Sequence, residues 1–174
     1  PLYNTHGDRK PHQFLFDGVP VVNGAFSQSS LLLNRVLVGL VQAHCRDAAT
    51  VLDLYSGSGN FSLGLGDDVQ VLGLDLSESA IAAARAQNRG EYQACDEQGF
   101  QEALAQQPWD VVILDPPRTG AKSVVSALAS AKTDRIVYVS CDPATLGRDL
   151  GALCRGGREV ESVTAVDMFP NTPH

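Results

Sequence analysis

Cys141 is the residue of this 174-residue chain whose type and setting most strongly indicate covalent chemistry. It closes an apolar run over residues 135–141 that predicts a strand. Asp142 and Pro143, which follow it, are typical of a helix cap and a first helical position. Amide dipoles at a helix N-terminus favour the thiolate, which is the nucleophilic form of cysteine. The sequence therefore predicts a nucleophilic thiol at the end of a strand, although most buried cysteines act only as small apolar residues.

Asp115 opens a second segment that could do chemistry, Asp-Pro-Pro-Arg-Thr-Gly over residues 115–120. It ends an apolar run over residues 110–115, so its carboxylate should emerge at the carboxyl end of a strand, where open α/β sheets bind ligands. The two prolines fix the backbone and remove amide donors, which predicts a stiff ledge rather than a helix start. Asp115 could accept a hydrogen bond from a ring N–H, and Arg118 could pair with a phosphate or a carboxylate. A merely rigid exit from the strand is the alternative.

Gly57 and Gly59 form a third segment, a tight turn after a predicted strand that contains Asp53. Glycines in such a turn let a ligand approach the backbone. Ser62 stands at the third-glycine position of the dinucleotide fingerprint, which disfavours a pyrophosphate ligand and therefore a dehydrogenase. Asp75 ends the next predicted strand, where an acidic side chain suits the ribose diol of a nucleoside-bearing cofactor. Alternatively, Asp75 could cap the helix that follows it.

The elements that must position these segments alternate along the chain, which predicts a doubly wound, mostly parallel α/β sheet. Apolar runs predict strands over residues 50–55, 69–75, 92–95, 110–115, 135–141 and 159–168. Helices are expected over residues 77–88, 97–106, 121–131 and 143–154. We interpret residues 1–174 as one domain with a short lead-in over about residues 1–26.

Two elements are expected before the first central strand. Residues 13–22 predict a hairpin around Asp17 and Gly18. From Ser27 onward, apolar residues at helical spacing predict a helix that faces the core; they are Leu32, Leu33, Val36, Leu37, Leu40 and Val41.

Composition limits the classes of function. The formal net charge of −7 argues against a domain that holds nucleic acid by bulk electrostatics, because affinity for the nucleic-acid backbone comes from Lys and Arg. The sequence has neither a long apolar span nor a signal-peptide pattern, so we expect a cytoplasmic protein. The four cysteines show no paired spacing and are interpreted as free thiols. Cys45, Cys95 and Cys154 lack the setting of Cys141 and are interpreted as buried, small apolar residues.

Taken together, three segments resemble the RNA 5-methyluridine methyltransferase family. They are Asp-Leu-Tyr-Ser-Gly-Ser-Gly-Asn-Phe-Ser at residues 53–62, the Asp-Pro-Pro-Arg-Thr-Gly segment, and Ser-Cys-Asp-Pro-Ala-Thr-Leu-Gly-Arg-Asp-Leu at residues 140–150. Asp-Met-Phe-Pro at residues 167–170 extends the match. The resemblance implies a class I, Rossmann-like methyltransferase domain that uses S-adenosyl-L-methionine, needs no metal, and methylates carbon 5 of a uridine in RNA. Ribosomal RNA is favoured over transfer RNA, but the sequence leaves both open, because that choice belongs to segments outside this chain.

The resemblance also implies residue roles. Cys141 would attack carbon 6 of uracil, which makes carbon 5 nucleophilic toward the sulfonium methyl group. The cofactor-binding residues would be Gln28, Tyr55, Gly57, Gly59, Asn60, Asp75, Asp96 and Asp115. The substrate-binding residues would be Phe26, Asp115, Pro116 and Arg118, since similar proline ledges hold planar bases against a cofactor methyl group.

The family's general base is a glutamate just after a Phe-Pro-x-Thr-x-His segment, and residues 169–174 of this chain carry that segment. The glutamate and the last strand of the sheet are therefore expected beyond His174, and the chain is expected to be a fragment. Ser30 stands where family members commonly carry asparagine. No iron–sulfur or RNA-binding segment precedes the domain in this sequence, so we expect that the segment that selects the RNA is missing from the chain.

Two other functions remain open on the sequence. A methyltransferase for another base, such as cytosine at carbon 5, would also need a cysteine, although arginine rather than cysteine after the two prolines speaks against it. A non-catalytic module that binds S-adenosylmethionine or RNA would keep these motifs without the base.

Overall fold

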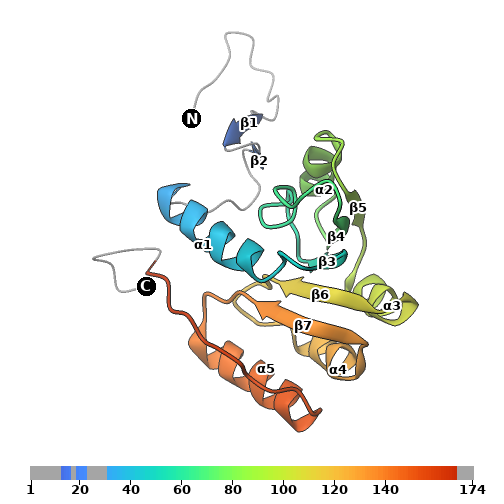
Figure 1. Cartoon of the computed structure of the whole chain (residues 1–174), viewed down its shortest axis with the longest axis vertical. Helices are drawn as coiled ribbons and strands as arrows, with labels where there is room; N and C mark the ends of the chain where they lie inside the picture. Colours follow the sequence, from blue (N-terminus) through green and yellow to red (C-terminus); the bar gives the residue numbers. More distant parts are fainter. Residues whose placement is uncertain (1–12, 17–18, 23–30, 168–174) are drawn as a thin grey trace.

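A five-stranded parallel sheet forms the centre of the computed structural model, which describes residues 13–16, 19–22 and 31–167 (Figure 1). The strand order is β5-β4-β3-β6-β7, so the direction of winding reverses between β3 and β6. The strands are β3 (Thr50–Leu54), β4 (Gln70–Asp75), β5 (Glu91–Ala94), β6 (Trp109–Leu114) and β7 (Thr133–Tyr138). The helices are α1 (Leu31–Ala43), α2 (Glu78–Arg85), α3 (Glu97–Gln106), α4 (Lys122–Ser130) and α5 (Pro143–Arg155). The predicted α/β class is confirmed.

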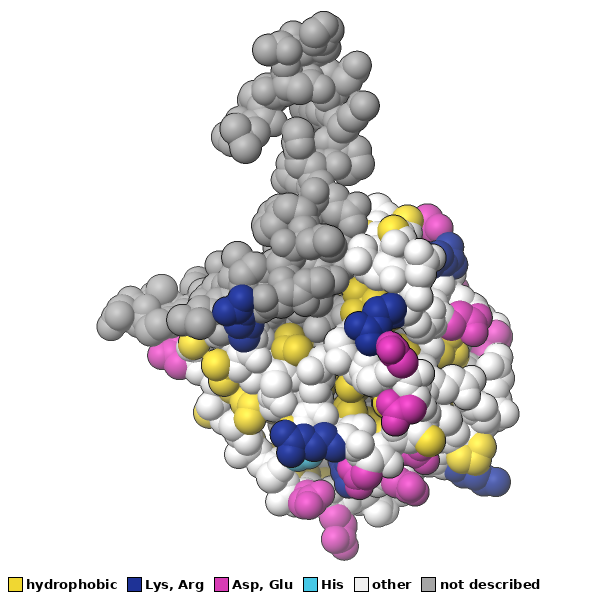
Figure 2. All heavy atoms as spheres, turned by 45° about the horizontal axis from the view of Figure 1, so that its top comes forward, with side chains coloured by type: hydrophobic (Ala, Val, Ile, Leu, Met, Phe, Trp, Pro, Cys, Tyr) yellow, Lys and Arg dark blue, Asp and Glu magenta, His cyan; other side chains and the backbone are white. Residues whose placement is uncertain are grey.

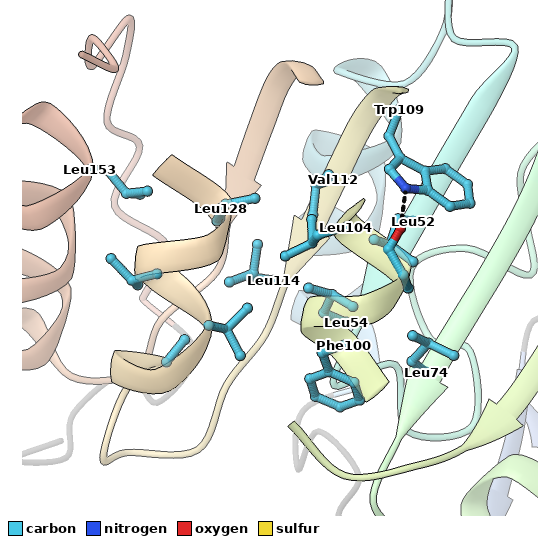
Figure 3. Packing of buried hydrophobic residues seen from close by; sticks show 14 residues of the cluster. Leu52, Leu54, Leu74, Phe100, Leu104, Trp109, Val112, Leu114, Leu128 and Leu153 are labelled. Carbon is cyan, nitrogen blue, oxygen red and sulfur yellow. Dashed lines mark hydrogen bonds between the residues drawn. The ribbon is translucent and has the colours of Figure 1, made fainter. Parts of the chain in front are cut away.

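Helices cover both faces of the sheet because side chains of the central strands alternate between two buried clusters. Leu52, Leu54, Val112 and Leu114 face α3, α4 and α5, whereas Val51, Val111 and Ile113 face α1 and α2. Figure 3 shows the first cluster, in which the Trp109 indole nitrogen donates a 3.0 Å hydrogen bond to the carbonyl oxygen of Ala103. The two clusters make a rigid sheet whose carboxyl edge can position side chains.

The predicted hairpin is present as β1 (Gln13–Phe16) paired antiparallel with β2 (Val19–Val22). The prediction that α1 faces the core along its whole apolar stripe is wrong in part. Val36 and Leu40 are 51% and 37% exposed, whereas Val41 and Cys45 are buried. Of the apolar side chains of α1 that the structure describes, Val41 belongs to a buried cluster and Leu37 and Val38 pack against it, so the carboxyl-terminal half of the helix contacts the core.

The predicted strand over residues 159–168 is wrong for the part that the structure describes. Residues 158–167 follow α5 without any strand pairing, and Val160 and Val163 are 47% and 74% exposed. A strand is stable only when a neighbour satisfies its backbone groups. Among the described strands, β7 pairs only with β6, so its other edge is free, but residues 158–167 do not pair with that edge.

Candidate active site

The carboxyl ends of β3, β6 and β7 bring the three chemical segments to one edge of the sheet. Register pairs Leu54 with Leu114 and Leu114 with Tyr138, and the amide of Val139 donates a 2.7 Å hydrogen bond to the carbonyl oxygen of Leu114. Tyr55, Asp115 and the residues leading to Cys141 therefore emerge side by side. The winding reverses between β3 and β6, and crevices at such a switch point are where doubly wound sheets bind ligands.

The glycine turn after β3 has a left-handed backbone. The φ angles of Tyr55, Gly57 and Gly59 are 60°, 55° and 86°. A β-carbon added to Gly57 would meet no described atom within 4 Å, so the turn leaves open space above its backbone. This is the geometry that a closely approaching ligand needs, as the sequence predicted.

Asp75 ties the end of β4 to this turn. Its Oδ2 accepts a 2.8 Å hydrogen bond from the Gly57 amide, and its Oδ1 accepts one of 2.8 Å from the Ser77 amide. The alternative that Asp75 caps α2 is wrong. The N-cap is Ser77, whose hydroxyl oxygen accepts a hydrogen bond from the Ala80 amide. A carboxylate can accept about four hydrogen bonds, so the half-buried Asp75 retains acceptor sites for a ribose diol.

Asp96 follows β5 and is the N-cap of α3. Its Oδ1 accepts hydrogen bonds from the Gln98 and Gly99 amides, both at 3.1 Å, and the residue is exposed. The capping role accounts for this aspartate structurally, so its predicted place beside a cofactor stays a prediction.

Asn60, a predicted cofactor residue, is held by a partner that sequence reasoning missed. Its amide exchanges two hydrogen bonds with the amide of Asn34 on α1, at 2.8 and 3.1 Å. Asn34 is only 9% exposed. The available signal was a polar residue within the apolar stripe of a predicted helix.

Tyr55 is fixed by α3. Its hydroxyl donates a 2.7 Å hydrogen bond to Glu97 Oε1, and its ring lies edge-on to Phe100 with ring centroids 4.9 Å apart. Burial, followed by the hydrogen bond to Glu97, raises the pKa of Tyr55, so the phenol stays protonated. The other oxygen of Glu97 accepts from the Ser123 hydroxyl on α4.

A buried polar group that sequence reasoning also missed lies beneath the turn. Asp53 is fully buried, and its Oδ2 accepts a 2.6 Å hydrogen bond from the Ser62 hydroxyl, which also lies 2.8 Å from the Tyr92 hydroxyl. Ser62 thus has a structural role at the position where a dinucleotide fold would have glycine. Burial raises the pKa of Asp53 to about 7, with a lowering contribution from Ser62 and raising ones from Asp115 and Asp75.

As the sequence predicts, the proline ledge does not start a helix, because α4 begins only at Lys122. Pro116 is buried, whereas Pro117 and Arg118 are exposed. Asp115 is half-buried, and removal of its carboxyl group from water raises its pKa to about 7. A carboxyl group in this state can either accept or donate a hydrogen bond near neutral pH.

Cys141 lies in the loop between β7 and α5, and its position needs one correction. The strand ends at Tyr138 rather than at Cys141, because the chain turns there toward α5. The cap is as predicted: Asp142 accepts a 2.8 Å hydrogen bond from the Thr145 amide, and Pro143 is the first helical residue. Cys141 is exposed, so its sulfur is accessible to a substrate.

The other thiols differ. Cys45 is buried and Cys95 half-buried, and burial is the largest cause that raises the pKa of each thiol, that of Cys45 to about 11. Cys154 is exposed, at the far end of α5, so its interpretation as a buried apolar residue is wrong. All four cysteines are free, as predicted.

The predicted residues Phe26, Gln28 and Ser30 lie outside the described residues. Within the described ranges, no cluster of three or more His, Cys, Asp or Glu side chains could hold a metal ion. Over the same ranges, no helix is both long and apolar enough to cross a membrane.

The chain is similar to known proteins over most of its length. A family model described as tRNA (Uracil-5-)-methyltransferase matches residues 101–174. The 23S rRNA (uracil(1939)-C(5))-methyltransferase RlmD of Haemophilus influenzae (strain 86-028NP) is 36% identical over 191 residues, which cover 99% of this chain and 42% of that protein. RlmD of Acinetobacter baylyi is 40% identical over 165 residues, which cover 88% of this chain and 35% of that protein.

Among solved structures, the tRNA (uracil-54, C5)-methyltransferase of Pyrococcus abyssi in complex with S-adenosyl-L-homocysteine matches with a TM-score of 0.78. It is 31% identical, and the match covers 95% of this chain and 43% of that chain. The chain thus spans less than half the length of these relatives. Within that span it belongs to the RNA uracil-C5 methyltransferase family.

Proposed function

We propose that this chain carries the cofactor site and the nucleophile of an enzyme that methylates carbon 5 of a uridine in RNA with S-adenosyl-L-methionine. The observation that carries the proposal is the exposed thiol of Cys141 beside the Asp115 ledge, at the edge where the glycine turn lies. Ribosomal RNA is favoured over transfer RNA because relatives that match nearly the whole chain are named for 23S rRNA.

The site fits the cofactor. Open space above Gly57, the left-handed turn and the remaining acceptor sites of Asp75 suit a nucleoside held close to the backbone. When bound, S-adenosyl-L-methionine supplies the methyl group. We assign its binding to Gln28, Tyr55, Gly57, Gly59, Asn60, Asp75, Asp96 and Asp115.

The thiolate of Cys141 adds to carbon 6 of uracil, and the electron pair of the carbon 5–carbon 6 bond moves toward the carbonyl oxygen at carbon 4, forming an enolate. Carbon 5 of this enolate would accept the methyl group, the sulfur–methyl bond of S-adenosyl-L-methionine would break, and S-adenosyl-L-homocysteine would leave with the electron pair of that bond. A base then removes the proton from carbon 5, and the electron pair of that bond expels the thiolate. The resemblance assigns the base to a glutamate expected just after His174.

The ledge positions the base in this scheme. Asp115 offers a hydrogen-bond partner to a ring N–H or to a carbonyl oxygen, since its pKa of about 7 allows both protonation states near neutral pH. Pro116 supplies an apolar surface, and the exposed Arg118 is available to an RNA phosphate.

RNA recognition by this part of the protein is expected to be local. In the face shown in Figure 2, Lys and Arg side chains lie singly among Asp and Glu side chains, without a continuous basic surface over the described residues. Together with the net charge of −7, this supports our proposal that segments outside this chain supply much of the affinity for RNA. The free thiols support a reducing, cytoplasmic setting.

The test is covalent trapping. The protein is mixed with S-adenosyl-L-methionine and 5-fluorouridine RNAs that represent a 23S rRNA segment and a tRNA, and intact mass is measured. Fluorine at carbon 5 blocks the proton-removal step, so a methylated adduct should accumulate without the general base. Cys141→Ser should abolish the adduct. Cys154→Ser, which changes the other exposed thiol, on α5, should not.

An adduct that survives Cys141→Ser would contradict the assignment of the nucleophile. Cofactor binding without any adduct would favour the non-catalytic module, and an adduct only with a 5-fluorocytidine RNA would favour a methyltransferase for the other pyrimidine.

A further inference from the structure

Asp149 is a buried carboxylate that the proposed mechanism leaves unused. It lies on α5, two turns after Cys141, and is only 2% exposed. Its Oδ2 accepts hydrogen bonds from the Ala121 amide at 2.8 Å and from the Tyr138 hydroxyl at 2.7 Å. Its Oδ1 accepts from the guanidinium of Arg148 at 2.8 Å. One carboxylate therefore joins the last residue of β7, the start of α4 and α5 itself.

These contacts act on the ledge because Ala121 directly follows Gly120, the last residue of the ledge. Helix α4 begins at Lys122 and has no side-chain cap of its own; Asp149, from another helix, satisfies the amide of its N-cap residue Ala121. Arg148 adds a second attachment, a 2.9 Å hydrogen bond to the carbonyl oxygen of Thr119. A carboxylate near the N-terminus of α4 also interacts favourably with the dipole of that helix.

Gly120 shows how closely the two segments approach. Its φ is +77°, and an added β-carbon would lie 2.4 Å from the terminal Arg148 nitrogen and 2.5 Å from Asp149 Oδ2. The backbone of the ledge thus passes directly over the carboxylate, and only glycine permits that approach.

We propose that Asp149 is a positioning residue, which holds the ledge over residues 115–120 against α5 so that Asp115 and Arg118 keep a fixed place relative to Cys141. The proposal rests on the proposed function for its catalytic consequence. Asp149 does not touch the substrate in this proposal, because the residue is buried behind the ledge. Displacements of about 1 Å between reacting groups can slow a reaction by about a hundredfold.

Three variants separate positioning from simple loss of stability. Asp149→Ala removes every contact. Asp149→Asn keeps an acceptor for Ala121 and Tyr138 but turns an amide donor toward Arg148. Only the hydrogen bond with Arg148 is therefore lost. Trp109→Phe is the matched control, because it removes a buried hydrogen bond at the opposite end of β6.

The first measurement needs no substrate. Hydrogen exchange of the Gly120 amide, which bonds to the carbonyl oxygen of Pro117 rather than to Asp149, should rise about tenfold in Asp149→Ala. It should rise less in Asp149→Asn and remain unchanged in Trp109→Phe. If Asp149→Ala does not fold, the exchange rate of the Gly120 amide in Asp149→Asn is compared with the rate in Trp109→Phe, and a higher rate in Asp149→Asn supports the proposal. Unchanged exchange of the ledge would overturn the proposal.

The second measurement is the rate of the 5-fluorouridine adduct at saturating RNA and cofactor. We expect a loss of about 10- to 100-fold in Asp149→Ala, a smaller loss in Asp149→Asn, and less than about twofold in Trp109→Phe. Saturating cofactor removes from this rate any change in cofactor affinity that follows from a shift of Asp115. An equal loss in all three variants would overturn the proposal. If the unaltered protein forms no adduct, the proposed function fails, whereas the exchange result still decides whether Asp149 holds the ledge.

Discussion

Asn34 and Asn60 form a reciprocal amide pair that joins α1 to the glycine turn, with hydrogen bonds of 2.8 and 3.1 Å. Each side chain donates through its nitrogen and accepts through its oxygen. The two amides therefore supply each other with hydrogen-bond partners in a part-buried site that water reaches poorly. The proposed cofactor contact at Asn60 therefore depends on a residue 26 positions earlier in the chain.

Asn34→Ala should release Asn60 and weaken binding of S-adenosyl-L-methionine by about three- to tenfold, measured by isothermal titration calorimetry. The free energy of unfolding should fall by about 1–2 kcal/mol, because the partner amide loses its hydrogen bonds in a part-buried site. Val36→Ala, at a 51% exposed position of the same helix, is the control and should leave affinity unchanged. Equal affinity in Asn34→Ala and the original protein would show that Asn60 needs no support.

Such pairs mark the limit of what the sequence predicts. Apolar runs predict the order of the central elements because buried strands and helices have local periodicities. The Asp142 cap was predictable for the same reason, since donor and acceptor lie three residues apart. The hydrogen bonds of Asn34 with Asn60, Tyr55 with Glu97, and Ser62 with Tyr92 join residues 26, 42 and 30 positions apart, and only packing of the whole sheet brings them together.

The last predicted strand fails for a related reason. The apolar residues near Val160 and Val163 have the pattern of a strand, but a strand forms only beside a partner, and a local pattern cannot say whether a partner is available. Local pattern therefore predicts which residues favour an extended backbone, not which of them pair.

Gly57 and Gly59 should respond differently to alanine although both have positive φ angles, +55° and +86°. At Gly57 the added methyl group meets no described atom, so Gly57→Ala should cost only about 1–2 kcal/mol of stability from backbone strain. Because that methyl group enters the open space above the turn, cofactor affinity should fall by at least about tenfold.

Gly59→Ala should instead act on folding, since its β-carbon would lie 2.6 Å from Leu63 Cγ. We expect a total loss of about 3–4 kcal/mol, the sum of strain and overpacking, measured by urea denaturation. The two variants control for each other. Equal stability of both would contradict the close contact with Leu63, and full cofactor affinity in Gly57→Ala would contradict the proposed binding surface.

Tyr55→Phe should separate the ring of this residue from its hydroxyl group. The variant keeps the edge-on contact with Phe100 and loses the hydrogen bond to Glu97, so stability should fall by about 1 kcal/mol, while cofactor affinity changes less than about threefold. Tyr55→Ala removes the ring as well and should weaken cofactor binding by about tenfold or more. If the phenylalanine variant binds as poorly as the alanine variant, the hydroxyl group rather than the ring makes the contact.

Asp53 predicts an unusual dependence of stability on pH. Its pKa is 3.8 in the reference state and about 7 in the fold, mainly because burial disfavours the charged form. Between these values the folded protein binds more protons than the unfolded chain, so the contribution of Asp53 to stability falls as pH rises from about 4 to about 7 and is constant beyond that. The expected loss is on the order of 2–4 kcal/mol.

Asp53→Asn should remove that dependence while keeping an acceptor for the Ser62 hydroxyl. The free energy of unfolding, measured by urea denaturation from pH 4.5 to 8, should therefore fall with rising pH more steeply in the original protein than in Asp53→Asn. Asp134→Asn, at an exposed carboxylate, should retain the original slope. Parallel curves for Asp53→Asn and the original protein would contradict the raised pKa and mean that Asp53 ionises in the fold as it does in the unfolded chain. The buried Oδ1, which has no hydrogen-bond partner in the structure, would then have to be stabilised as a charged group.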